Sequence, residues 1–171
     1  MQATYFLATI YDYGDGVERD SAKANNLYMS AATLGLPRAQ AIMYVLQLAD
    51  KKHRKVENII PALANLADQD PMGSLRWYCE GLHNLATEED GYDVSEQLTN
   101  CLEKLKNVDE ASAYRLMASA YFGGLSYRKN DVKGVEMAKK AAAAGDLRAH
   151  PLLANAYYNG KGTARDLISA Y

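Results

Sequence analysis

The sequence predicts an all-α solenoid, a fold in which antiparallel helix pairs stack along the chain. Residues 3–39 superpose on residues 113–149 after a shift of 110 positions, without a gap. Apolar residues recur at helical spacing in every segment, and no stretch alternates in the manner of a strand. Self-similarity at a period of a few tens of residues is typical of a repeat array.

The period divides a single domain into five helix-turn-helix repeats. Four of them contain 36, 35, 39 and 36 residues, and the fifth is partial. Their boundaries are 3–38, 39–73, 74–112, 113–148 and 149–171. Two helices per repeat give about nine to ten helices. Because the chain begins and stops inside repeats, we expect it to be part of a longer protein.

The first repeat defines the pattern of a unit. A helix over about residues 3–12 ends at Gly14-Asp15-Gly16, because glycine readily takes the left-handed conformation of a tight reversal. Asp20 caps the second helix, which ends at Gly35. The residues expected to face the core are Ala3, Leu7, Ala8, Ile10 and Tyr11 in the first helix and Ala24, Leu27, Tyr28, Ala31 and Ala32 in the second.

The other repeats keep this pattern to different degrees. In the second, the basic run Lys51–Lys55 replaces the glycine turn, and Asp70 caps the helix that follows. The third carries the acidic loop Glu88–Asp93, and Asp93 with Glu96 forms a capping-box pattern. The expected core residues of these two repeats are Ile42, Met43, Leu46, Ile59, Ile60, Leu63, Leu66, Ala67, Leu98, Cys101, Leu102 and Leu105.

The composition excludes several classes of function. Hydrophobic residues make up 49% and charged residues 23%, which is ordinary for a globular domain. A net charge of −2 argues against a general nucleic-acid binder, which needs a basic surface to displace counterions. No apolar run approaches the roughly 20 residues that span a bilayer. The two cysteines and three histidines show no metal or nucleophile spacing, so no cofactor is expected.

Three repeats share a recognisable motif. In the first it comprises Leu7, Ala8, Tyr11, Gly14, Gly16, Asp20, Lys23, Ala24, Tyr28, Ala31, Ala32, Gly35 and Ala39. The fourth matches it at Tyr121, Gly124, Lys133, Ala141, Ala142, Gly145 and Ala149, and the fifth at Leu153, Ala154, Tyr157, Gly160, Gly162 and Asp166. This motif resembles the Sel1-like repeat, a subfamily of the tetratricopeptide-type helical repeats.

The resemblance implies a right-handed α/α superhelix whose concave face is lined by the first helix of each repeat. Similar proteins act as adaptors or scaffolds, and many are bacterial. The expected location is the bacterial periplasm or envelope, or the cytoplasm. Some relatives carry one disulfide per repeat, a pattern that this chain lacks. Cys79 and Cys101 occupy facing positions in the third repeat, either as one bridge or, as burial statistics favour, as reduced thiols.

Residues at spacing i, i+4 and i+7 on each first helix are predicted to face this concave surface. A mixture of aromatic, arginine and acidic side chains suits recognition of a peptide or a helix. An ordinary solvated surface is the alternative for each residue. The five rows are Tyr5, Thr9 and Asp12; Ala41, Val45 and Leu48; Arg76, Glu80 and His83; Arg115, Ser119 and Phe122; and Pro151, Asn155 and Tyr158.

Other candidate features have structural alternatives. Trp77 is either an interface anchor or a core residue, and a lone tryptophan favours the core. The basic run Lys51–Lys55 and the acidic loop Glu88–Asp93 are either binding loops or solvated connections. Glu80 and His83 share a helical face and could perform acid–base chemistry, but no nucleophile, phosphate loop or metal triad accompanies them, so we do not predict an enzyme.

The sequence therefore predicts a scaffold or adaptor that binds another protein or peptide through the concave face of the solenoid. One alternative is an inhibitor or immunity protein that sequesters a bacterial effector. Another is a purely structural segment of a larger envelope protein. The central repeats depart most from the shared motif, so we expect a specialised contact surface around them.

Overall fold

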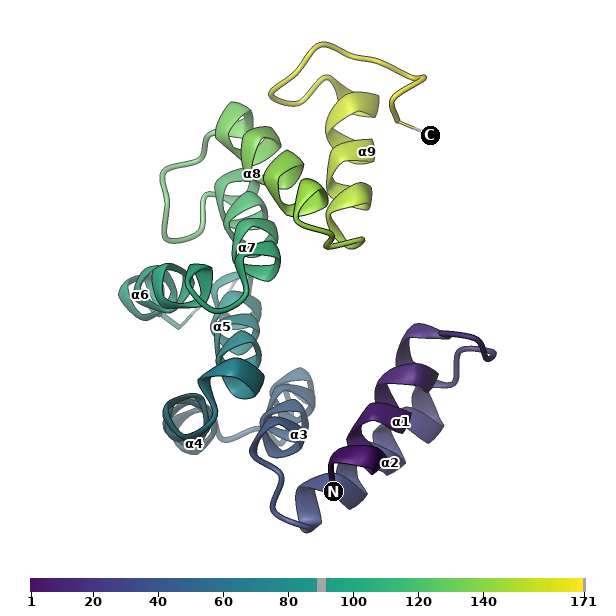
Figure 1. The fold of residues 1–171 in the computed structure, drawn as a ribbon. Helices are drawn as coiled ribbons and strands as arrows, with labels where there is room; N and C mark the ends of the chain where they lie inside the picture. The colour runs from purple at the N-terminus through teal and green to yellow at the C-terminus, as the bar shows by residue number, and fades with distance from the viewer. Residues whose placement is uncertain (89–91, 171) are drawn as a thin grey trace. The chain divides into compact units, whose positions relative to one another are not determined.

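The computed structural model describes residues 1–88 and 92–170, and these residues form nine α-helices and no strand (Figure 1). The chain divides into two compact units, residues 1–78 and 79–171, and the boundary lies inside the fifth helix. The helices are α1 (Gln2–Tyr13), α2 (Ser21–Thr33), α3 (Pro37–Ala49), α4 (Val56–Gln69), α5 (Pro71–Ala86), α6 (Ser95–Lys106), α7 (Glu110–Gly123), α8 (Asp131–Ala143) and α9 (Ala149–Asn159).

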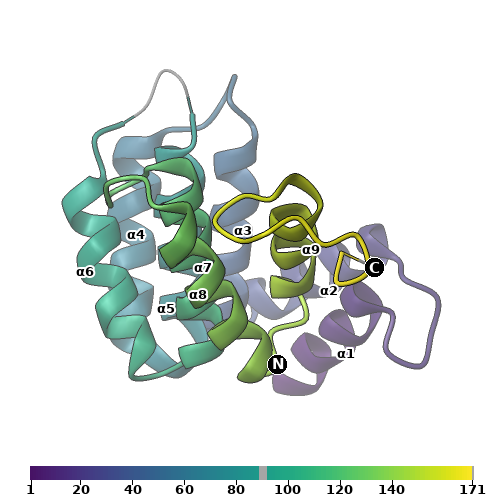
Figure 2. The ribbon, with the colours of Figure 1, turned by 90° about the horizontal axis from the view of Figure 1, so that it is seen from above.

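Within each unit, helices that follow one another in the chain pack together. In unit 1, α1 packs on α2, α2 on α3, and α3 on α4. In unit 2, α7 packs on both α6 and α8, and α8 also packs on α9; the adjacent positions of α6, α7 and α8 are visible in two views (Figures 1 and 2). The predicted helix-pair repeat is therefore confirmed.

The glycine turn and the polar cap are built in the same way in the first and fourth repeats. Gly14 ends α1 with φ 72°, and Gly124 ends α7 with φ 75°. The Asp20 carboxylate accepts a hydrogen bond from the Lys23 N–H at 2.9 Å, which caps α2. The side chain of Asn130 accepts from the Lys133 N–H at 3.0 Å and caps α8. These bonds satisfy amides that the first helical turn leaves unpaired.

The fifth repeat forms its first helix and its turn. Gly160 and Gly162 have φ 64° and 71°. Asp166 then begins a turn rather than a helix, because it accepts hydrogen bonds from the Ile168 and Ser169 amides at 3.0 and 3.2 Å. The Ser169 hydroxyl also donates to this carboxylate, at 2.7 Å.

The caps of the central repeats differ from the prediction in one case. Asp70 caps α5 as expected, accepting from the Gly73 N–H at 3.1 Å. The capping box of Asp93 and Glu96 is wrong, because Val94 is the residue that precedes α6, and it is buried. Asp93 lies one residue too early and accepts only a 3.4 Å bond from the Ser95 N–H. The acidic loop Glu88–Asp93 lies partly outside the described residues.

The core of unit 1 is made of small and aromatic residues. Ala8, Ala24, Tyr28 and Ile42 form a buried cluster, and Trp77 packs against it. Trp77 therefore has the structural role that the sequence favoured. In unit 2 the largest buried side chains are leucines: Leu82, Leu85, Leu98, Leu102, Leu105 and Leu116.

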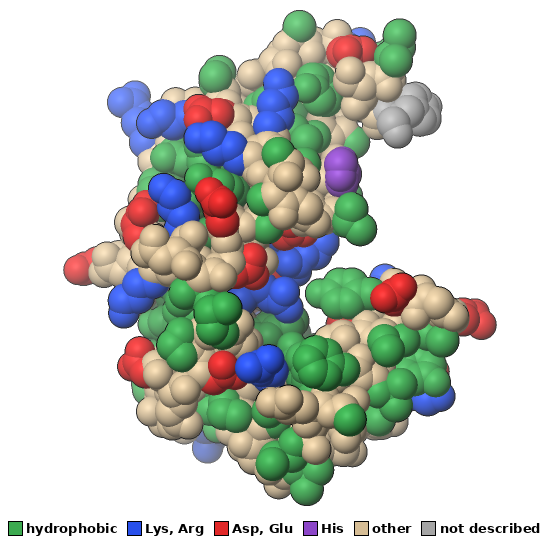
Figure 3. Space-filling view, in the orientation of Figure 1, with side chains coloured by type: hydrophobic (Ala, Val, Ile, Leu, Met, Phe, Trp, Pro, Cys, Tyr) green, Lys and Arg blue, Asp and Glu red, His purple; other side chains and the backbone are tan. Residues whose placement is uncertain are grey.

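One face of α1 is more exposed than expected. Leu7 is 43% exposed and Ala3 is exposed, although both were predicted to face the core. The equivalent residues of α7, Met117 and Ala113, are buried because α6 packs on that side. Within unit 1, α1 packs on α2, and apolar side chains are spread over the visible surface of these two helices (Figure 3). Leu46, also predicted as core, is 40% exposed.

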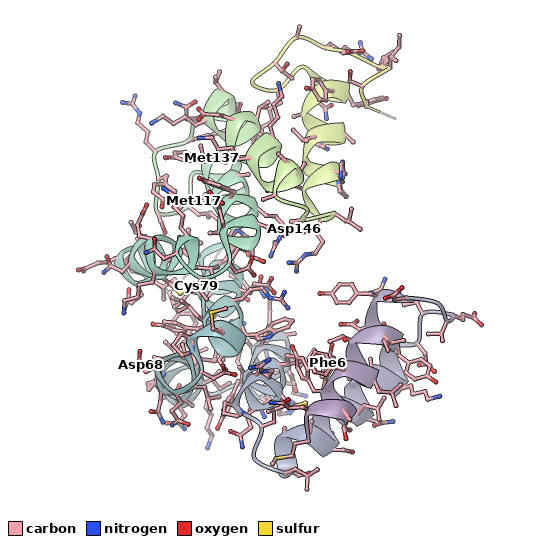
Figure 4. All side chains as sticks on the ribbon, viewed as in Figure 1. Phe6, Asp68, Cys79, Met117, Met137 and Asp146 are labelled. Atoms are coloured by element: carbon pink, nitrogen blue, oxygen red, sulfur yellow. A yellow bond between two sulfur atoms is a disulfide. The ribbon has the colours of Figure 1, made fainter. Side chains whose placement is uncertain are left out.

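The two cysteines form a disulfide. Cys79 on α5 and Cys101 on α6 are bonded across a Cα–Cα distance of 5.6 Å, and both side chains are buried (Figure 4). The interpretation as reduced thiols is therefore wrong. Burial statistics describe single residues, whereas the pairing of α5 with α6 brings these two positions face to face.

Candidate functional site

The row residues of unit 1 lie on α1, α3 and the first half of α5. Five of the predicted residues are partly exposed, and we call them the unit 1 row: Tyr5, Thr9, Asp12, Val45 and Arg76. Leu48 was predicted with them but is 2% exposed, and Ala41 is fully buried. The prediction for Leu48 is wrong because α3 packs on α4 and the following loop folds back, with Arg54 Nη1 donating to the Leu48 carbonyl at 2.9 Å.

Tyr5 is surrounded by aromatic and basic side chains. Its ring centre lies 5.6 Å from that of Tyr28 and 5.9 Å from that of Phe6. The Arg38 guanidinium lies 5.8 Å from the Tyr5 ring centre. Burial raises the pKa of the Tyr5 hydroxyl, while the positive charges of Arg76 and Arg38 act in the opposite direction. The hydroxyl is therefore a neutral hydrogen-bond donor at physiological pH.

The two arginines near Tyr5 differ in their partners. Arg38 donates to both carboxylate oxygens of Asp70, at 3.0 and 3.3 Å. The Arg76 guanidinium lies 4.3 Å from the Trp77 ring centre, which is a cation–π geometry. Among the described residues no carboxylate forms an ion pair with Arg76. The basic end of the unit 1 row therefore carries one positive charge that has no ion-pair partner among the described residues.

The other end of α1 carries the polar members of the row. Asp12 accepts a hydrogen bond from the Tyr28 hydroxyl at 3.4 Å. Burial and the Asp12 charge raise the pKa of Tyr28. The Thr9 hydroxyl donates to the Phe6 carbonyl at 2.8 Å. Asp12 lies two turns from Tyr5, about 10 Å along the helix, so the row has basic and acidic ends.

In unit 2 two of the predicted residues belong to a network of four charged side chains. Arg115 binds Glu80 at 2.6 Å and Asp146 at 2.9 Å, and Arg148 binds the same two carboxylates at 3.1 Å each. We call these four residues the unit 2 network; Figure 4 marks Asp146 at the turn between α8 and α9. Two positive and two negative charges compensate one another, which is the arrangement that burial requires.

Asp146 and Arg148 were not among the residues predicted from the sequence. Burial acts to raise the pKa of Asp146, but the hydrogen bond and charge of Arg148 outweigh it and hold this pKa below its usual range. The repeat itself held one sequence signal, because Arg148 occupies the same position of the repeat as Arg38. Arg38 also pairs with an aspartate, Asp70, at the start of the first helix of a repeat.

His83 and Ser119, from neighbouring rows, are brought together. His83 Nε2 lies 2.9 Å from the Ser119 hydroxyl oxygen. Burial and the nearby Arg115 charge lower the pKa of His83, so its ring is neutral at pH 7. Glu80, the proposed partner of His83 in acid–base chemistry, is instead bound by two guanidinium groups. No carboxylate within the described residues is hydrogen-bonded to His83.

Phe122 of the fourth row and Asn155 of the last row line a small cleft in unit 2. Phe122, Leu152, Asn155, Ala156 and Lys161 line about 120 Å³ of space. Lys161 Nζ lies 5.1 Å from the Phe122 ring centre. Phe122 and Asn155 therefore lie on one surface.

Tyr158, the last residue of that row, is 56% exposed on α9. The Arg165 guanidinium lies 5.7 Å from its ring centre. The structure thus leaves Tyr158 open to solvent beside a basic side chain.

The described residues contain neither a membrane-spanning helix nor a metal-binding cluster. No described helix has the length and apolar content needed to cross a membrane. Across residues 1–88 and 92–170, no group of three or more histidine, cysteine, aspartate or glutamate side chains is placed to hold a metal ion.

Stacked helix pairs with glycine turns define an α-helical repeat protein. The sequence profile of the Sel1 repeat matches residues 2–36, 111–146 and 149–171, more than half of the chain. The chain therefore belongs to the Sel1 repeat family, whose members are generally scaffolds for protein–protein interaction. A comparison with curated proteins finds no match.

Solved structures of bacterial proteins share the fold. A Sel1 repeat protein from Oxalobacter formigenes is 22% identical in sequence, with a TM-score of 0.57. The match covers 99% of this chain and 66% of that protein. A protective antigen of uropathogenic Escherichia coli, c5321, is 25% identical in sequence, with a TM-score of 0.52. The match covers 99% of this chain and 36% of that protein. A sel1 repeat protein from Klebsiella pneumoniae is 17% identical in sequence, with a TM-score of 0.64. The match covers 99% of this chain and 81% of that protein.

Proposed function

We propose that this protein binds another protein or a peptide through the unit 1 row. The observation that carries the proposal is the uncompensated Arg76 beside Tyr5 and Trp77 on a partly exposed surface. Arginine, tyrosine and tryptophan are the side chains that most often dominate binding energy at protein interfaces. The membership of the Sel1 repeat family supports the same function.

The residues of unit 2 divide into two groups under this proposal. Phe122, Asn155 and Tyr158 are open to a partner, whereas Glu80 and Arg115 are engaged in the unit 2 network. His83 Nε2 and the Ser119 hydroxyl are hydrogen-bonded to each other. The network supports the second candidate function, a structural segment of a larger protein, for this part of unit 2.

The proposal is tested by a pair of matched threonine variants. Thr9 in the unit 1 row and Thr33 on α2 each donate a hydroxyl to the carbonyl three residues earlier, at 2.8 and 2.9 Å. Partners are captured with the intact protein and identified, and their affinity is then measured with purified components. Thr9→Glu should weaken binding by about tenfold or more, since it places a charge in the contact.

Thr33→Glu serves as the control and should bind like the unchanged protein. Equal affinity of the Thr9→Glu variant and the unchanged protein would contradict the role of the unit 1 row. Capture of no partner by the intact protein would favour the structural-segment alternative. An inhibitor of a bacterial effector, the other alternative, would be recognised by the identity and activity of the captured protein.

A further inference from the structure

Arg76 occupies the same position of the repeat as Arg115, and the two arginines differ in what surrounds them. Arg115 binds Glu80, the middle residue of the preceding row, and Asp146. The middle residue of the row that precedes Arg76 is Val45, which has no charge. The described residues thus supply two carboxylates to Arg115 and no ion pair to Arg76.

Arg76 is partly buried, which makes the missing carboxylate costly. A guanidinium carries five N–H donors and stays charged at any pH that a protein experiences. Contact with the Trp77 ring compensates only part of the lost hydration. A carboxylate supplied by a binding partner would complete the arrangement that Arg115 shows within the same chain.

Two further donors lie near this guanidinium. The Trp77 indole N–H is shielded from solvent and has no acceptor in full hydrogen-bond geometry, although it is close enough to the Tyr5 hydroxyl to help lower its pKa. The Tyr5 hydroxyl is itself within the field of Arg76 and Arg38. The Arg76 guanidinium and the Tyr5 hydroxyl thus lie on one partly exposed surface, with the shielded Trp77 indole N–H close to them.

We propose that Arg76, together with the Tyr5 hydroxyl, forms a subsite beside the Trp77 ring that binds a carboxylate side chain in an acidic segment of a partner protein. This inference rests on the proposed function and adds the chemistry of the partner. The pairing of Arg38 with Asp70 leaves Arg76 as the cation that the ligand neutralises. Asp12, at the far end of α1, repels further negative charge and limits how far an acidic segment extends along the row.

Trp77 provides a direct signal for the test, because it is the single tryptophan of the chain. The ¹⁵N-labelled protein gives one indole N–H resonance, which is followed at low salt while a blocked tetraglutamate peptide is added. We expect a saturable shift of this resonance. The same length of blocked tetraglutamine should cause none, because it lacks the charge that the guanidinium recognises.

Two variants assign the effect to the subsite. Arg76→Gln should weaken tetraglutamate binding by about tenfold, the loss typical of one charge-assisted hydrogen-bonded contact. Tyr5→Phe keeps the ring and should weaken binding by a smaller factor. Arg128→Gln, which removes an exposed arginine of unit 2, is the charge-matched control and should leave the titration unchanged.

Each other outcome overturns the subsite. These outcomes are no shift with tetraglutamate, an equal shift with tetraglutamine, or unchanged binding by the Arg76→Gln variant. Inorganic phosphate that saturates the resonance at lower concentrations than tetraglutamate would assign the site to phosphate instead. The threonine variants test the proposed function separately. If Thr9→Glu weakens partner binding but tetraglutamate does not bind, the unit 1 row is retained as the binding surface and only the carboxylate subsite is rejected.

Discussion

At the scale of single residues, the chain places glycine where the backbone has a positive φ, where the surroundings are crowded, or where both hold. Gly16 and Gly162 occupy equivalent turn positions with φ 72° and 71°. A side chain at position 16 would meet open space, whereas one at position 162 would collide with the backbone of Asp131 and Val132. Substituting Gly16 therefore measures the free-energy cost of the left-handed backbone conformation alone, whereas substituting Gly162 adds the cost of a steric clash.

We predict that Gly162→Ala destabilises the protein more than Gly16→Ala. The second variant should lose about 1 kcal/mol of unfolding free energy from the left-handed conformation alone. The first should lose about 1–3 kcal/mol more, since the backbone of α8 has to shift. Urea unfolding followed by circular dichroism measures both. Equal losses would show that the turn does not pack on α8.

A second residue-scale prediction concerns Asp146, whose side chain is 6% exposed. At neutral pH Asp146→Asn should cost about 2–3 kcal/mol, because two guanidinium groups lose their shared carboxylate. Glu136→Gln, which breaks a solvent-exposed pair with Lys140, should cost much less than Asp146→Asn. Chemical denaturation at pH 7 compares the two variants.

The contribution of Asp146 should also depend on pH. Its pKa is lower in the folded protein than the ordinary value of 3.8, so its stabilisation is complete above that value and is lost as the pH falls through the folded pKa. The stability difference between the Asp146→Asn variant and the unchanged protein should therefore shrink below about pH 4. A difference that stays constant down to pH 2 would contradict this account.

At the scale of helices, the sequence predicted what local chemistry determines. The caps at Asp20 and Asp70 and the turn at Gly14 depend on neighbouring residues, and all three were predictable. The burial of Leu48 was not, because it depends on how α4 closes over α3. The same holds for the exposed Leu7, which only a neighbouring helix would bury.

The disulfide links α5 to α6 within one repeat. Closing a loop of 22 residues stabilises a folded domain by about 3 kcal/mol through the unfolded chain. We predict that dithiothreitol lowers the thermal midpoint of the protein. A Cys79→Ser, Cys101→Ser double variant should already have this lower midpoint and should not respond to the reductant. Two reactive thiols in the native, oxidised protein would disprove the bridge.

At the scale of the whole molecule, repetition predicted the fold, whereas a specialised contact surface around the divergent central repeats stays a prediction. Arg76 and Arg115 occupy one position in successive repeats, yet only Arg115 has carboxylate partners within the described chain. The sequence placed both in rows but could not distinguish them. The partners of Arg148 are up to 68 residues away in sequence, which no local pattern reveals.

The central claim is that a partner contacts the unit 1 row, and site-specific photo-crosslinking tests it most directly. A benzoylphenylalanine is placed at Val45 in the row or, as a control, at the exposed Glu57 on α4. The account predicts that the identified partner is crosslinked from position 45 and not from position 57. Crosslinking from position 57 alone, or equally from both positions, would contradict it.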